Sequence, residues 1–182
     1  MSLRLIVMRH AKSDWTDPFQ DDHDRVLNPR GQRSATALGR WLADQGYWPD
    51  CVLCSSAART QETWARIAPS GPHPAAHHVL DTLYLARAQT MLNILRARAQ
   101  GSCVLLIAHN PGIGQMAQML ARTPPNSSNF QRYPTGFSAV LDFEDEEWAQ
   151  VDWARGKLID HIGPRSLPQT AIKMGRHKDG PN

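Results

Sequence analysis

The sequence predicts an α/β layered domain, and three observations support this fold class. Strand-like apolar runs alternate along the chain with segments whose apolar residues recur at helical spacing. A length of 182 residues suits one domain of ordinary size. The composition, with 41% hydrophobic and 20% charged residues, is typical of a globular protein in water. Because we find no internal repeat and no interdomain linker, we expect a single domain.

In the first half of the chain, two predicted strands are each followed by a predicted helix. Residues 3–8 form an apolar strand, and residues 31–45 carry apolar side chains at helical spacing up to a glycine that favours a helix end. Residues 51–54 form the second strand. Ser56 can cap the helix that follows, which extends to about residue 67.

The second half repeats this alternation and then ends in a predicted pair of strands. The elements expected there are a brief strand at 79–80, a helix at 90–99, a strand at 103–108, a helix at 111–121 capped by Asn110, a loop at 123–135, and strands at 137–143 and 148–154.

The start of the chain bears on where the protein acts. It begins Met-Ser-Leu-Arg and continues directly into the first apolar strand, without the long apolar stretch and cleavage site of a signal peptide. The longest apolar runs, such as 104–108, are too short to cross a bilayer. We therefore expect a cytoplasmic protein with no membrane partner.

The chain is mildly basic, with a formal charge of +3 and a pI near 9.0, and such a balance suits an anionic substrate. Lys173, Arg176 and Lys178 cluster near the C-terminus without interleaved aromatic residues. We interpret this cluster as a solvated tail and expect no nucleic-acid binding. The predicted organisation is one domain over residues 1–160 and a loosely ordered basic tail over 161–182, with the oligomeric state left open.

The cysteines and clustered histidines favour structural roles. Cys51 and Cys54 form a Cys-x-x-Cys motif, but it lies in a predicted buried strand rather than at the start of a helix, where redox pairs are typical. His73, His77 and His78 have no carboxylates at ligand spacing. We expect no metal site and no cofactor.

The first strand ends in an Arg9-His10 pair. In open α/β sheets the carboxyl ends of the strands line the binding crevice. An imidazole held in its neutral form can attack phosphorus, and a neighbouring guanidinium both favours that form and grips phosphoryl oxygens. Taken alone, the pair also fits a salt bridge or a surface role.

Two further strand ends carry groups of the same kind. Arg59 falls in the first turn of the helix after the second strand, where a cation is disfavoured unless an anion binds nearby, although it also fits a side chain in solvent. His109 follows the strand at 103–108, just before a helix start. If protonated, it would stabilise the charge that develops in phosphoryl transfer. These three strand ends predict a phosphate pocket.

The motifs around these residues resemble the histidine phosphatase superfamily, whose fold is phosphoglycerate-mutase-like, and in particular its SixA branch of phosphohistidine phosphatases. The segments that carry the resemblance, in the family's order, are 5–15 (Leu-Ile-Val-Met-Arg-His-Ala-Lys-Ser-Asp-Trp), 27–31, 55–63, 107–112 and 133–136. The resemblance implies a three-layer α/β/α sandwich with a mostly parallel central sheet and helices on both faces.

The resemblance also implies roles for individual residues. His10 would be the nucleophile, and Arg9, Arg59 and His109 would form the phosphate pocket with it. Ser13 matches a phosphate-contacting serine of the family, although it also fits an ordinary turn residue. Asp81, three residues before a tyrosine, is the best match to the general acid of larger members. A phosphohistidine substrate makes an acid optional, because imidazole leaves more readily than an alkoxide.

Three functions remain in view. Only fifty positions separate Arg59 from His109, too few for the cap that covers the pocket in larger members of the family. An open site favours a SixA-like phosphatase acting on a phosphorylated protein, such as a phosphohistidine domain, through a phosphohistidine intermediate on His10. The alternatives are an enzyme for small phosphate esters, as a phosphomonoesterase or a mutase, and a non-catalytic domain that binds phosphoproteins.

Overall fold

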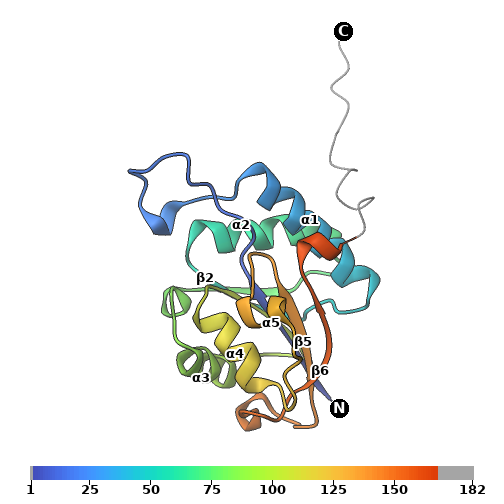
Figure 1. Ribbon diagram of the computed structural model, residues 1–182. Helices are drawn as coiled ribbons and strands as arrows, with labels where there is room; N and C mark the ends of the chain where they lie inside the picture. The colour runs from blue at the N-terminus through green and yellow to red at the C-terminus, as the bar shows by residue number, and fades with distance from the viewer. Residues whose placement is uncertain (1, 168–182) are drawn as a thin grey trace.

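A six-stranded sheet forms the centre of the molecule, in the computed structural model that describes residues 2–167 (Figure 1). The strands lie in the order β3-β2-β4-β1-β5-β6. β1 pairs in parallel with β4, β4 with β2, and β2 with β3, whereas β5 and β6 are antiparallel. The strands are β1 Leu3–Arg9, β2 Cys51–Ser55, β3 Ala76–Leu80, β4 Cys103–Ala108, β5 Ser138–Phe143 and β6 Lys157–Ile162.

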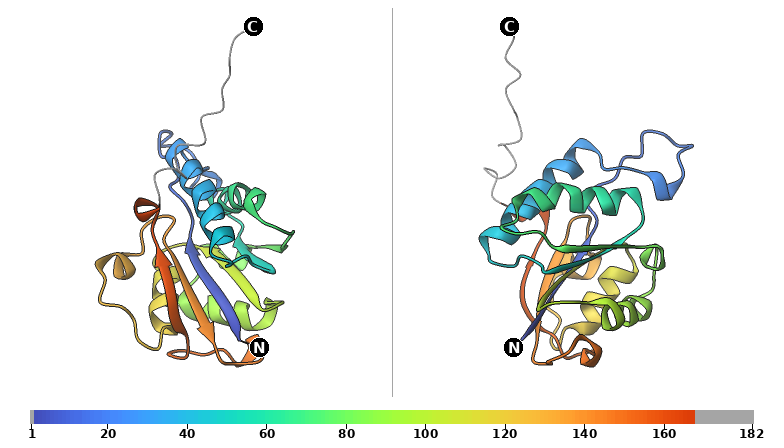
Figure 2. Two further views of the ribbon diagram at one scale, coloured as in Figure 1. Left: turned by 90° about the vertical axis from the view of Figure 1, so that its right-hand side faces the viewer. Right: turned by 180° about the vertical axis from the view of Figure 1, so that it is seen from behind.

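Helices cover both faces of the sheet, because successive side chains of each central strand are buried on opposite sides. Ile6 and Met8 of β1 pack with the first two helices, and Leu5 and Val7 pack with the other three. Figure 2 shows the sheet between the two layers. The helices are α1 Pro29–Asp44 and α2 Ala58–Ile67 on one face, and α3 Ala88–Arg98, α4 Gly112–Leu120 and α5 Ser128–Arg132 on the other. This arrangement confirms the predicted three-layer, mostly parallel α/β/α class.

The last predicted strand, at 148–154, is wrong. Trp148–Gln150 is a 3-10 helix, and the strand that pairs with β5 is β6. The apolar residues of this segment are buried elsewhere: Trp148 and Val151 join the core beside α3, where the Trp148 indole donates to the Gly101 carbonyl over 2.8 Å. The apolar residues at 148–154, whose pattern resembled a strand, are therefore explained by burial against a helix.

The predicted loop at 123–135 contains α5, which the sequence interpretation missed. The Ser127 hydroxyl caps this short helix by accepting from the Phe130 amide, and Phe130 is fully buried. One aromatic anchor thus orders a segment whose prolines indicated irregular structure. Two predicted caps are also wrong, since neither Ser56 nor Asn110 caps the helix that follows it.

The C-terminal boundary expected at residue 160 falls inside β6, which continues to Ile162. Leu167 is only 3% exposed and belongs to the core on the α1 and α2 face. The rest of the expected tail, residues 168–182, lies outside the described residues. No helix within residues 2–167 is long and apolar enough to span a membrane.

The Cys-x-x-Cys motif lies in buried β2, as expected for structural cysteines. Burial raises the pKa of the Cys54 thiol to about 12, so this thiol stays protonated and unreactive.

Candidate active site

His10 lies immediately after β1, where its amide still donates to the Ala108 carbonyl of β4 over 3.2 Å. Its imidazole Nδ1 is 2.7 Å from the Ala11 carbonyl oxygen. Because a carbonyl can only accept, Nδ1 carries the proton and Nε2 presents its lone pair. The residue is 6% exposed, so the hydrogen bond and the surrounding residues hold the ring in one orientation.

The environment keeps this ring neutral. Burial lowers the pKa of His10 to about 3, and the positive charges of Arg59 and Arg9 act in the same direction, against the effect of the bond to Ala11. At neutral pH the side chain is therefore a free base with an oriented lone pair, which a nitrogen nucleophile requires.

Arg59 lies in the first turn of α2 and bridges the two histidines. Its Nε donates to His10 Nε2 over 3.3 Å, and one Nη is 3.3 Å from His109 Nδ1. The guanidinium also donates to the Asp22 carbonyl and, over 2.9 Å, to the Asp22 carboxylate. A buried planar cation thus faces the His10 nucleophile, as a phosphate grip needs.

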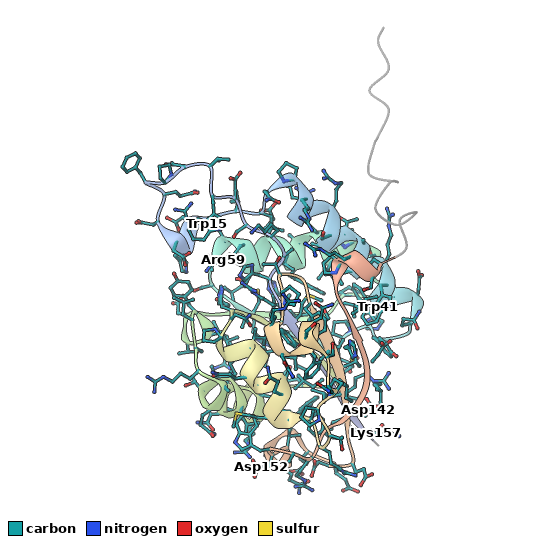
Figure 3. All side chains as sticks on the ribbon, viewed as in Figure 1. Trp15, Trp41, Arg59, Asp142, Asp152 and Lys157 are labelled. Atoms are coloured by element: carbon teal, nitrogen blue, oxygen red, sulfur yellow. The ribbon has the colours of Figure 1, made fainter. Side chains whose placement is uncertain are left out.

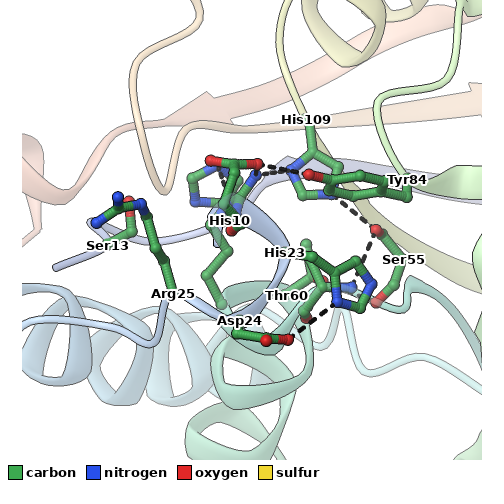
Figure 4. A network of polar contacts seen from close by, with 12 residues as sticks. His10, Ser13, His23, Asp24, Arg25, Ser55, Thr60, Tyr84 and His109 are labelled. Carbon is green, nitrogen blue, oxygen red and sulfur yellow. Dashed lines mark hydrogen bonds and ion pairs between the residues drawn. The ribbon is translucent and has the colours of Figure 1, made fainter. Parts of the chain in front are cut away.

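His109 follows β4 and is 2% exposed. Its ring centroid is 5.2 Å from that of His10, and its Nε2 is 2.7 Å from the Ser55 hydroxyl (Figure 4). Since Nδ1 accepts from Arg59, Nε2 carries the proton and donates to Ser55. Burial, reinforced by Arg59, lowers the pKa of His109 to about 3. A bound phosphate would reverse this balance, because its negative charge favours the imidazolium.

Arg9 supplies a second cation with no counter-ion in the described chain. One Nη donates to the Tyr133 carbonyl over 3.1 Å, and the buried Nε has no partner. Burial and the charge of Arg59 lower the pKa of this guanidinium. An unpaired buried donor next to a second cation is costly unless an anion binds there. Arg9, His10, Arg59 and His109, which the sequence predicted to share a site, are thus brought together.

Asp22 is the carboxylate that the structure adds to this site. It receives hydrogen bonds from Arg59 and, over 2.6 Å, from the Tyr84 hydroxyl, and the Tyr84 ring packs edge-on to His109 at 5.5 Å. Partial burial raises the pKa of Asp22, but these two bonds outweigh it, and the pKa is lowered overall. Asp22 is therefore ionised in the free protein.

Asp81, the acid expected from the resemblance, forms no hydrogen bond or ion pair with the two histidines or Arg59 among the described residues, and its role stays a prediction. It is the exposed first residue of the 3-10 helix Asp81–Leu83 after β3, and its carboxylate makes no hydrogen bond within the described residues. The tyrosine that follows it, Tyr84, does reach the site, but pairs with Asp22.

Ser13 is buried and its hydroxyl accepts from the Trp15 indole over 3.0 Å. None of its hydrogen bonds involves the two histidines or Arg59. Its role as a phosphate contact thus stays a prediction.

The segment between β1 and α1 carries Asp22 to the site because a buried arginine organises it. The Arg25 guanidinium is 4.1 Å from the Trp15 ring centroid and donates to the carbonyls of Asp17 and Gln20 over 2.9 and 2.8 Å. In Figure 3, Trp15 lies at the same end of the molecule as Arg59.

Two polar side chains fix the reactive loops. The Thr63 hydroxyl accepts from the Ala11 amide over 3.1 Å and donates to the Arg59 carbonyl over 2.7 Å, which ties the nucleophile loop to α2. The Asn110 amide donates to the carbonyls of Arg132 and Tyr133. In residues 2–167, no group of three or more His, Cys, Asp or Glu side chains is arranged to hold a metal ion.

Comparisons with known proteins bear on the family of the chain. The sequence profile of the histidine phosphatase superfamily (branch 1) matches residues 5–84. The chain is 32% identical over 166 residues to an uncharacterised protein of Mycobacterium leprae, a match that covers 87% of this chain and 100% of the relative.

Two solved structures share the fold over nearly their whole length. The candidate phosphohistidine phosphatase SixA of Nakamurella multipartitia has a TM-score of 0.76 at 32% identity, covering 90% of this chain and 97% of that one. The corresponding candidate SixA of Agrobacterium tumefaciens has a TM-score of 0.72 at 29% identity, covering 89% and 98%. The resemblance seen in the motifs is confirmed: the chain belongs to the histidine phosphatase superfamily, in its SixA-type branch, and is a phosphatase of that family.

Proposed function

We propose that this protein is a cytoplasmic phosphohistidine phosphatase that transfers the phosphoryl group of a phosphorylated protein to His10 and then to water. The observation that carries the proposal is the oriented, unprotonated Nε2 of His10, which faces Arg59 in a pocket where the guanidinium of Arg9 has no counter-ion among the described residues and its buried Nε has no partner. A phosphoryl group in this space meets a nucleophile and two cations at once.

In the first step, His10 Nε2 attacks phosphorus while the bond from phosphorus to the substrate imidazole breaks. The electron pair of that bond returns to the leaving ring, which departs as neutral imidazole because its other ring nitrogen carries a proton. The guanidinium groups of Arg9 and Arg59 and a protonated His109 stabilise the charge on the phosphoryl oxygens. In the second step, water attacks the phosphorus and loses a proton to solvent, and the bond to Nε2 breaks, which releases inorganic phosphate and restores the free imidazole.

The short segment between Arg59 and His109 supports a protein substrate. The residues between Arg59 and His109 form the rest of α2, β3, α3, β4 and short connections, all of which belong to the sheet and its two layers. None of this segment is left to build a cap over the pocket, which favours a phosphorylated side chain on a folded protein as the substrate. The SixA names of the two solved structures support the same substrate class.

The decisive experiment compares the hydrolysis of a phosphohistidine protein domain with that of a panel of small phosphate esters. We expect the higher kcat/KM for the phosphohistidine domain, and an acid-labile, alkali-stable phosphoenzyme in rapid-quench samples. His10→Ala should remove the phosphoenzyme and lower kcat/KM at least about a thousandfold. His73→Ala changes an exposed histidine in the loop before β3 and is the matched control. Undiminished turnover in His10→Ala would refute the mechanism.

One observation favours the second candidate, a phosphatase for small phosphate esters. The Tyr84 hydroxyl borders His109, is held in place by the ionised carboxylate of Asp22, and carries the proton that an alkoxide leaving group needs and a phosphohistidine substrate does not. This alternative would be established if a small ester had a clearly higher kcat/KM than the phosphohistidine domain and if Asp22→Asn removed that advantage.

A further inference from the structure

A cleft next to the active site has only basic charged residues in its lining. Its volume is about 320 Å³, and Lys12, Arg30, Arg132 and Arg165 line it without any Asp or Glu. Another large cavity, between α1 and α2, includes Asp44 in its lining. A purely basic lining therefore distinguishes the cleft beside the active site.

The four cations come from four separate segments that the fold brings together. Lys12 follows the nucleophile, Arg30 lies in the first turn of α1, Arg132 ends α5, and Arg165 lies in the 3-10 helix Pro164–Ser166, which packs against α1 (Figure 1). All four side chains are exposed, and none forms an ion pair within residues 2–167. Like charges so arranged repel one another unless an anion lies between them.

The cleft shares a wall with the phosphate pocket. The carbonyl of Tyr133 accepts from Arg9 on one side, and the next two residues, Pro134 and Thr135, line the cleft on the other. On the α1 side, the Lys12 carbonyl accepts from the Asn28 amide over 3.0 Å, and a Cβ on Gly31 would lie 2.1 Å from that same carbonyl oxygen. The start of α1 is thus held tightly against the loop that carries His10.

We propose that this cleft binds an acidic segment of the substrate protein, while the phosphorylated side chain of that same substrate enters the active site. Several cations from different segments match several carboxylates in series, which a polypeptide supplies. Pro134, Phe137 and Pro164 add apolar contacts for the rest of that chain. The inference depends on the proposed function for its protein substrate, but the charge preference of the cleft is testable without any turnover.

The first test measures binding alone. A fluorescent hexaglutamate peptide is titrated by anisotropy at low salt against the wild type, Arg30→Ala/Arg165→Ala, and the charge-matched control Arg33→Ala/Arg98→Ala. Arg33 and Arg98 are exposed on α1 and α3 and lie outside the cleft. We expect about a tenfold weaker affinity in the cleft variant only, and weaker binding by the wild type in added salt. Equal affinities in the two variants would overturn the proposal.

The second test uses turnover of two phosphohistidine peptides that differ only in flanking Glu or Gln residues. The wild type should prefer the Glu peptide in kcat/KM, and this preference should vanish in the cleft variant while hydrolysis of acetyl phosphate stays unchanged in both variants. If the wild type hydrolyses neither peptide, the proposed function fails, and the hexaglutamate result still decides the cleft. If a small bisphosphate instead of hexaglutamate shows the dependence on Arg30 and Arg165, the acidic segment is the wrong occupant.

Discussion

The parallel and antiparallel halves of the sheet contribute to the active site in different ways. Parallel strands β1 and β4 end directly at the two histidines, and β2 leads into the helix that carries Arg59. The antiparallel half contributes main-chain groups: just before β5, the Gly136 amide donates to the carbonyls of Arg9 and His10 over 3.1 and 2.9 Å. The parallel half therefore carries the reactive side chains, and the antiparallel half, here called the supporting half, holds their main chain in position.

Removal of a reactive group from the parallel half should therefore have the largest effect on catalysis. Arg59→Ala deletes the cation that contacts both histidines, and we expect kcat/KM to fall by about 10²–10³. Arg66→Ala, an exposed arginine on the same helix, should stay within about threefold of the wild type. Steady-state kinetics on one phosphorylated substrate measures both. Similar losses in the two variants would mean that α2 stability, rather than phosphate binding, controls the rate.

The two parallel strand ends should also make folding sensitive to pH. His10 and His109 have pKa values of about 3 in the folded protein, against 6.5 in the unfolded chain. Below pH 6.5 the unfolded chain therefore binds protons that the folded state does not, and stability is lost as the pH falls from 6.5 toward 3. Between pH 7 and pH 5 we expect a loss of about 2–4 kcal/mol in the free energy of unfolding.

Urea unfolding at the two pH values tests this expectation, with His10→Gln/His109→Gln as the variant that should lose much of the dependence. Inorganic phosphate should weaken it as well, because an anion in the pocket favours the protonated rings. A pH slope that is unchanged in the double variant would assign the dependence to other groups.

The same contrast explains what the sequence could predict. The parallel strands form continuous apolar runs, so their ends, and with them His10, Arg59 and His109, could be located from the pattern alone. The sheet class followed from the same alternation of runs. The antiparallel edge was harder, because the apolar residues at 148–154 pack beside α3, and β6 has a mixed pattern of half-buried residues.

Asp22 could not be predicted because its position depends on a loop rather than on a strand. The turn around buried Arg25 brings it to Tyr84, a partner 62 positions away in the sequence. The nearby Asp81 had the expected spacing from the same tyrosine but lies on an exposed turn. In the sequence, the cluster of aspartates at 21, 22 and 24 was the signal for a carboxylate near the active site, but this cluster does not indicate which of the three side chains turns inward.

A change in the supporting half should affect folding more than chemistry, and Gly136 offers a controlled case. Its φ of +75° favours glycine, and a Cβ there would lie 2.7 Å from the Pro164 ring. Gly46 has a similar φ of +69° with nothing within 4 Å. We expect Gly46→Ala to cost about 1 kcal/mol and Gly136→Ala about 2–3 kcal/mol in urea unfolding, with a fall in kcat for Gly136→Ala alone. Equal losses in the free energy of unfolding would show that the backbone conformation, and not the contact with Pro164, requires a glycine at position 136.

The smallest expected effect comes from one hydroxyl at the boundary between the two halves. The Tyr133 side chain is fully buried, and its hydroxyl donates to the Val7 carbonyl of β1 over 2.7 Å. Tyr133→Phe keeps the ring packing with Phe130 and Phe137 but leaves that carbonyl one donor short, which should cost about 1–2 kcal/mol in thermal or urea unfolding. Because Arg9 contacts the main-chain carbonyl of Tyr133 and not its hydroxyl, kcat/KM should stay within about threefold of the wild type. A large loss of activity at unchanged stability would mean that the supporting half positions the reactive groups through this hydroxyl as well as through its main chain.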